Sequence, residues 1–154
     1  MKKTFLICLG LYFSFSLSAQ STETSFMKKG RWLVEQGTNA EGLFNDGGVF
    51  NVNIDMGKFV TENFAIKLKG YAFLGDVEGF GIGLGLKNYF GGKLPVEVGF
   101  IYNDNVEQVL FNANLGYAIK LAQNVYLEPS AGIITDEEFS DIVFNPKITF
   151  AMIL

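Results

Sequence analysis

One pattern runs through this sequence from residue 30 to its end: about ten residues in which apolar side chains alternate with small or polar ones, and then a turn. The clearest case begins at residue 80, where one parity consists of Phe80, Ile82, Leu84 and Leu86, and the other holds three glycines and Lys87. Successive side chains of a strand point to opposite faces, so strict alternation predicts a strand with two different environments. Repeated about eight times, the pattern predicts a closed barrel with an apolar outside and a polar inside.

The alternation and the turn residues between its segments predict eight strands. They cover residues 31–37, 49–59, 64–74, 79–90, 96–102, 109–120, 125–134 and 142–154. Short turn-like links alternate with longer polar connections, as in outer-membrane barrels that keep both chain termini on the periplasmic side. The expected fold class is therefore all-β, an eight-stranded antiparallel up-and-down transmembrane β-barrel.

The first 19 residues are predicted to be an export signal. Lys2 and Lys3 precede an apolar stretch over residues 5–15, and the small residues of 16–19 supply a cleavage context. The apolar stretch is shorter than the ~20 residues that a membrane-spanning helix needs. We therefore expect a signal peptide at 1–19 and an outer-membrane barrel domain at 20–154. Cys8 lies within the apolar stretch, too early for a lipid-modified cysteine.

Composition argues against several classes of function. The chain has no histidine, and its single cysteine lies in the predicted signal. The mature chain thus lacks disulfides, thiol nucleophiles and the commonest metal ligand and general base. The net charge of −4 disfavours nucleic-acid binding. We expect no catalytic residue, no cofactor, no metal site and a monomer.

Strand parity places most charged residues inside the barrel, because an isolated Lys or Arg facing lipid at mid-membrane costs about 2–4 kcal/mol. The predicted inward bases are Arg31, Lys67, Lys69, Lys87, Lys120 and Lys147, and the predicted inward acids are Glu35, Asp55, Glu97 and Glu128. Side chains fill an eight-stranded barrel. The sequence therefore predicts a packed network of salt bridges and amides, with the alternating glycines leaving room for large neighbours.

The four longer connections are expected to face the outside of the cell. They contain ten acidic residues and no Lys or Arg: Glu41, Asp46, Asp76, Glu78, Asp104, Glu107, Asp136, Glu137, Glu138 and Asp141. Aromatic residues near strand ends form interfacial girdles in membrane barrels. We expect that role, with the rings pointing outward, for Trp32, Phe59, Phe90, Tyr102, Tyr117 and Phe144.

The mature chain resembles the small eight-stranded outer-membrane β-barrel proteins of Gram-negative bacteria, the outer membrane protein beta-barrel domain family. The resemblance rests on residues 30–34, 57–66, 83–90 and 124–128. It implies a non-enzymatic integral protein of the cell outer membrane, with a structural or surface-interaction role. The implied partners are outer-membrane lipid, lipopolysaccharide and the assembly machinery. The chain departs from the family pattern at Leu154, where such barrels commonly end in an aromatic residue.

Other functions remain open at this stage. A secreted or periplasmic lipocalin-like barrel would turn the apolar parity inward and bind a small apolar ligand. A narrow solute pore would need a wider lumen than eight strands normally leave. The acids at 136–138, together with Asp141, could bind a hard cation such as Ca²⁺, and a divalent cation could bridge these loops to lipopolysaccharide phosphates. Glu97 and Glu128 could in principle perform acid–base chemistry, although no positioned nucleophile accompanies them.

Overall fold

The computed structural model describes residues 27–39, 50–74, 79–104, 107–140 and 142–154. These residues form β1 (Trp32–Asn39), β2 (Phe50–Phe59), β3 (Phe64–Leu74), β4 (Gly79–Phe90), β5 (Leu94–Asn103), β6 (Gln108–Gly116), β7 (Ile119–Ala122), β8 (Val125–Thr135), β9 (Ile142–Phe144) and β10 (Lys147–Ile153). Within the described part of the chain, no helix is long and apolar enough to cross a membrane. The predicted signal peptide at 1–19 lies outside the described residues.

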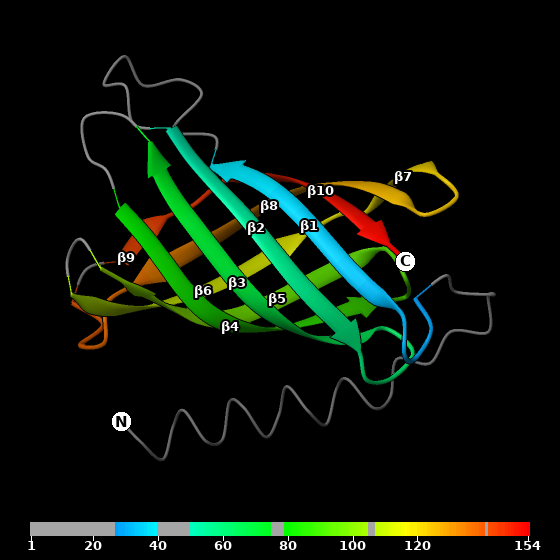
Figure 1. Ribbon diagram of the computed structural model, residues 1–154, viewed down its shortest axis with the longest axis horizontal. Helices are drawn as coiled ribbons and strands as arrows, with labels where there is room; N and C mark the ends of the chain where they lie inside the picture. Colours follow the sequence, from blue (N-terminus) through cyan, green and yellow to red (C-terminus); the bar gives the residue numbers. More distant parts are fainter. Residues whose placement is uncertain (1–26, 40–49, 75–78, 105–106, 141) are drawn as a thin grey trace.

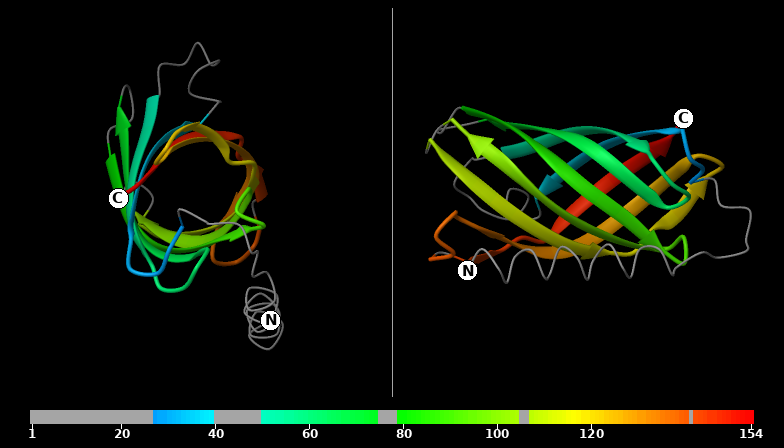
Figure 2. Two further views of the ribbon diagram at one scale, coloured as in Figure 1. Left: turned by 90° about the vertical axis from the view of Figure 1, so that its right-hand side faces the viewer. Right: turned by 90° about the horizontal axis from the view of Figure 1, so that it is seen from below.

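Each strand pairs antiparallel with its neighbours, and β10 pairs with both β1 and β8, which closes the sheet into a ring (Figures 1 and 2). β6 and β7 both pair with β8, while β9 continues the line of β10. The ten assigned strands therefore make a closed barrel of eight. This confirms the predicted fold class.

Two predicted strands are each divided in two, and a different proline accounts for each interruption. The gap between β6 and β7 lies opposite Pro129, whose carbonyl accepts from the Tyr117 amide at 3.0 Å but which has no N–H to return. The gap between β9 and β10 contains Pro146 itself, next to Asn145. Proline removes one ladder hydrogen bond in each place. The strand is therefore interrupted there, while the register of cross-strand partners continues on either side.

Cross-strand register shows how steeply the strands are staggered. The row of partners that starts at Leu33 passes through Gly57, Lys67, Gly85, Gly99, Asn112, Ile134 and Val143. Val143 precedes Lys147 by four residues, and Lys147 pairs with Asn39. If this pairing is counted back along the chain, Val143 corresponds to a point four positions beyond Asn39. The row of partners therefore closes ten positions beyond its starting residue, Leu33, and this offset is the stagger of the barrel. A stagger of this kind tilts the strands and leaves a lumen that side chains can fill.

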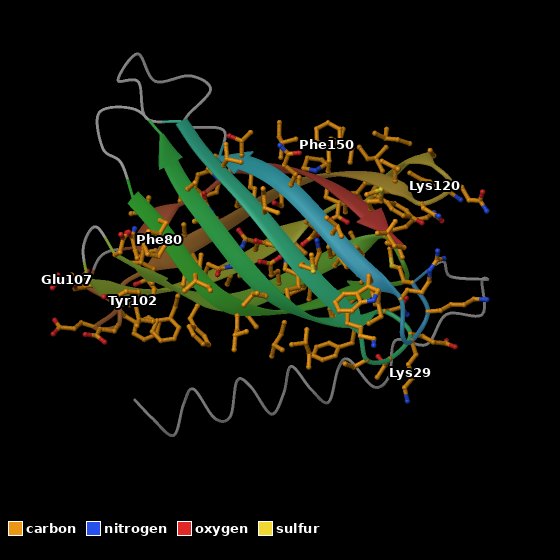
Figure 3. The ribbon with its side chains drawn as sticks, in the orientation of Figure 1. Lys29, Phe80, Tyr102, Glu107, Lys120 and Phe150 are labelled. Atoms are coloured by element: carbon orange, nitrogen blue, oxygen red, sulfur yellow. The ribbon has the colours of Figure 1, made fainter. Side chains whose placement is uncertain are left out.

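The two faces of the wall follow the predicted parity. On β2 and β3, Ile54 and Leu68 are 61% and 52% exposed, whereas their neighbours Asp55 and Lys67 are at most 1% exposed. Phe150 points away from the wall in Figure 3 and is 54% exposed. Apolar residues therefore cover the outside of the barrel, and charged residues lie within it.

The two ends of the barrel carry opposite charge. The turn end bears the exposed lysines Lys28, Lys29, Lys58, Lys93 and Lys120, with Glu62 as the acid among them. At the loop end, the described acids are Asp104, Glu107, Asp136, Glu137 and Glu138, and no lysine or arginine accompanies them in the described loop segments. Figure 3 shows Lys29 and Lys120 at one end and Glu107 at the other. The remaining predicted loop acids, Glu41, Asp46, Asp76, Glu78 and Asp141, lie outside the described residues.

Candidate functional site

The lumen is organised around one ammonium group. Lys67, on β3, places its Nζ 2.8 Å from Asp55 Oδ2 and 2.7 Å from Glu97 Oε2, and it also pairs with Glu35. The carboxylates come from β2, β5 and β1, and the side chains of Lys67, Glu35 and Asp55 are fully buried. Lys67 thereby links four strands through the interior of the barrel.

Two further lysines extend this cluster across the lumen. Lys69 Nζ lies 2.5 Å from Glu97 Oε1 and donates to Asn112 Oδ1 at 3.1 Å. Lys87 pairs with Glu35 and with Glu128. The ion pairs and the Asn112 hydrogen bond therefore form one continuous network that reaches from β6 to β8 by way of β1, β3, β4 and β5.

The charges inside the lumen balance. The fourth lysine is Lys147, which donates to the Asn53 amide oxygen at 3.1 Å when that amide is oriented to donate to Gly37 O at 2.8 Å. Four lysines (Lys67, Lys69, Lys87 and Lys147) thus accompany four acids (Glu35, Asp55, Glu97 and Glu128), all eight of them buried. Buried charges are tolerated when charges of opposite sign accompany them, so this balance lowers the free-energy cost of burying eight ionised side chains.

Three carboxylates of the network could in principle hold a hard cation. Oxygens of Glu35, Asp55 and Glu97 lie within 4.8 Å of one another. The Lys67 ammonium contacts all three, so the protein's own cation takes the position that a metal ion would occupy. Glu97 and Glu128, the acid–base candidates, are likewise paired with lysines and no more than 5% exposed. The arrangement is suited to holding strands together.

A small cavity lies beside the network. Its volume is about 20 Å³, and Lys87, Glu97, Asn114, Glu128 and Lys147 are among its lining residues. This is about the space that one water molecule needs. The cavity is polar and too small for an organic ligand.

An apolar layer closes the turn end of the lumen. It consists of Met27, Leu33, Phe59, Ala65, Tyr89, Ala118, Tyr126, Ala151 and Ile153. The Phe59 and Tyr89 rings lie 5.9 Å apart, and both are fully buried. The composition of this layer is not evident from the alternation, and the predicted outward orientation of Phe59 is wrong. Phe59 shares the parity of Asp55 and Gly57, which an unbroken count along β2 reveals.

Met27 reaches the lumen because the segment before β1 folds under the barrel. The Gly30 amide donates to Phe59 O at 2.8 Å, and the Arg31 amide donates to Lys28 O at 3.2 Å. Met27 is 2% exposed, although it precedes the first strand. An isolated methionine outside the alternating pattern carries no sequence signal for such a position.

Two of the predicted inward bases lie at the turn end of the barrel and not among the eight buried charges. Lys120 is exposed on β7 at the turn end, where the wall extends past the interruption opposite Pro129. Arg31 is half-buried at the same end, and its guanidinium donates to Ile153 O at 3.4 Å. The other four, Lys67, Lys69, Lys87 and Lys147, all lie in the lumen as predicted.

The predicted girdle residues are mostly outward. Trp32, Tyr102, Tyr117 and Phe144 are each exposed near strand ends, while Phe90 is half-buried. Trp32 also receives Lys58 Nζ over its ring, at 5.3 Å from the centroid. At the turn end, aromatic and basic side chains therefore share the outer rim.

Comparison with known proteins identifies the fold. No protein-family model matches the chain, and no curated protein does either. Two solved structures are similar. The N-terminal β-barrel domain of Pseudomonas aeruginosa OprF has a TM-score of 0.64 at 12% identity, and a structure from "De novo design of transmembrane beta-barrels" has a TM-score of 0.58 at 16% identity. Each match covers 82% of this chain and 98% of the other. The chain therefore has the fold of transmembrane β-barrels.

Proposed function

We propose that this chain is a non-enzymatic integral protein of a Gram-negative outer membrane, with a structural or surface-interaction role. The observation that carries the proposal is that the barrel is polar inside and apolar outside, the reverse of a barrel that is soluble in water. Eight buried charges balance one another inside, and apolar side chains cover the outside. Such a wall is stable in hydrocarbon and would be a large aggregation-prone surface in water.

The same observation weighs against the lipocalin-like alternative. A carrier of an apolar ligand needs an apolar cavity at the centre of its barrel. Here the centre holds the Lys67 network, and the apolar layer at the turn end is packed with the protein's own side chains. The filled lumen equally disfavours a solute pore.

The charge difference between the ends supports an orientation. The acidic loop end would face the cell exterior, where a surface partner would meet it. The basic turn end would face the periplasm together with the N-terminal segment. Outer-membrane lipid, lipopolysaccharide and, during insertion, the assembly machinery are the partners that this orientation favours.

Gel migration with and without boiling tests the proposal. We expect the mature chain to fractionate with outer membranes, and its folded band to shift on boiling in detergent. Leu84→Lys tests whether the outer wall faces lipid. It puts one charge on that wall at mid-strand, where a lysine costs about 2–4 kcal/mol in lipid. It should reduce the folded band in vesicles. Recovery of the unaltered chain as a detergent-free soluble protein would instead support the lipocalin-like alternative.

A further inference from the structure

An apolar groove of about 490 Å³ crosses the outer wall from β3 to β8. One of its sides is a row of registered cross-strand partners, Ile66, Leu86, Val98, Ala113 and Ile133. Its other side is the next outward row, which includes Phe100 and its partner Phe111. Backbone of Gly85 and Gly99 lies between the rows. The groove therefore belongs to the outer surface, separate from the lumen.

Ala113 has the smallest side chain in this row. Its partners in the row, Val98 and Ile133, have branched side chains, whereas Ala113 extends only one carbon from the wall. The groove also extends from one end of the barrel towards the other. Ile66 lies two residues after the turn-end start of β3, and Ile133 lies two residues before the loop-end finish of β8. It thus runs obliquely from the turn half of the wall towards the acidic loops.

A strained turn after β8 places an aromatic ring over the loop end of this groove, called its upper end below. Phe139 has a φ of +56°, which is rare for a bulky residue and costs free energy. Asp136 holds the turn: its carbonyl accepts from the Phe139 amide at 3.2 Å, and its Oδ1 accepts from the Ser140 amide at 2.8 Å. The Phe139 ring then stacks on Phe111 with centroids 5.8 Å apart and planes 12° apart.

We propose that this groove holds one acyl chain of a lipid from the leaflet on the loop side, with Phe139 covering the chain at its upper end. The proposal rests on the proposed function, because the groove is continuous with the wall that would face hydrocarbon. Its lining is almost entirely apolar, and its end at Thr135 and Phe139 lies at the loop end of β8.

The shape of the groove favours a single chain over a second barrel. Lipid tails are as apolar as the wall, so an occupant is preferred in the membrane only for its packing contacts. A flexible chain that enters from the loop side can follow the floor past Ala113 and touch both rows on its way, gaining dispersion contacts with each of them. The convex wall of a second copy would meet the rims of the groove and leave Ala113 uncovered.

A paramagnetic lipid can test the assignment. The probe is phosphatidylcholine with a nitroxide on one acyl chain, added to methyl-labelled protein in detergent micelles. A zwitterionic headgroup is chosen so that the signal reports the acyl chain and not the charge of the headgroup near Asp136, Glu137 and Glu138. At about one probe per protein, we expect the Val98 and Ile133 methyl signals to lose at least twofold more intensity than those of Ile54 and Ile148, which point outward elsewhere on the wall.

Two matched variants separate the groove from general lipid contact. Ala113→Phe fills the groove and should abolish the excess loss at Val98 and Ile133. Ala131→Phe adds the same ring at an exposed neighbouring position outside the groove and should leave the excess unchanged. Phe139→Ser should reduce it.

Three results would overturn the proposal: equal broadening of all four methyl signals, an excess that survives Ala113→Phe, or a wild-type dimer that Ala113→Phe converts to a monomer. The last would identify a second copy as the occupant. Each of these can occur in a barrel that still shows the heat-dependent gel shift. Failure of the groove is therefore distinguishable from failure of the proposed membrane function.

Discussion

At the scale of single residues, Lys67 makes more of the described ion pairs inside this barrel than any other side chain. It contacts three carboxylates from three other strands, and it has no exposure to solvent. Removing one member of a buried pair leaves an uncompensated charge, which costs more than the pair contributes. Lys67 is therefore the position where one substitution should disturb the most strands.

We expect Lys67→Met to lower the free energy of unfolding by about 3–5 kcal/mol, measured by urea unfolding of the refolded barrel in detergent or vesicles. Asp55 makes its ion pair with Lys67, whereas Glu35 and Glu97 each pair with a second lysine. Adding Asp55→Asn restores neutrality and should recover part of the loss. Lys120→Met, at an exposed site, is the control and should match wild type. A Lys67→Met barrel as stable as the control would contradict this role.

At the scale of elements, the glycines of β4 have different functions although they share one parity. A Cβ on Gly85 would lie 3.2 Å from Lys69 Cδ, so this glycine leaves room for a luminal lysine, as the sequence predicted. A Cβ on Gly83 would lie 1.9 Å from Phe100 O, on the backbone of β5. Gly83 therefore allows two strands to approach closely, which alternation alone does not reveal.

This difference gives a paired prediction. Gly83→Ala should destabilise the barrel by about 3 kcal/mol, because the neighbouring backbone cannot move aside without breaking the β4–β5 ladder. Gly85→Ala should cost less than about 1 kcal/mol, since a flexible lysine side chain can shift. Denaturant midpoints of the two variants, measured side by side, decide the matter. Equal midpoints would show that the close approach at Gly83 can relax.

The segment before β1 is an element that only the structure reveals. Met27→Ala should cost about 2–4 kcal/mol, the typical loss on truncating a buried aliphatic side chain. Met152→Ala, on the outer wall, is the matched control and should cost much less in lipid or detergent, because hydrocarbon refills the space. The same urea unfolding assay compares them. If Met27→Ala were as mild as Met152→Ala, residues 27–31 would not hold the turn end closed.

At the scale of the whole molecule, the separation of charge between the two ends predicts its orientation in the cell. Cys8 lies in the predicted signal, so a single cysteine can be introduced into an otherwise thiol-free mature chain. With Glu107→Cys, a membrane-impermeant maleimide should label intact cells. With Lys120→Cys, labelling should require disruption of the outer membrane (Figure 3 shows the two sites at opposite ends). If only the Lys120→Cys variant were labelled in intact cells, the barrel would have the opposite orientation to the one predicted.

The sequence by itself determined the strand number, the face that each strand turns outward and the acidic character of the loop end. Those properties depend on period-two alternation and on the cost of placing charge in hydrocarbon, which are local and can be read along the chain. It also placed Lys67, Lys69, Lys87 and Lys147 correctly in the lumen.

Only the tertiary structure decided which of these residues meet. Lys67 and Glu35 are brought together by the stagger of the strands around the ring, a property of the closed barrel that no single segment contains. The same holds for Met27 under the turn end and for Phe139 above the groove at Ala113. Each position results from contacts between segments distant in the chain, so it could not be derived from the alternation within a single strand.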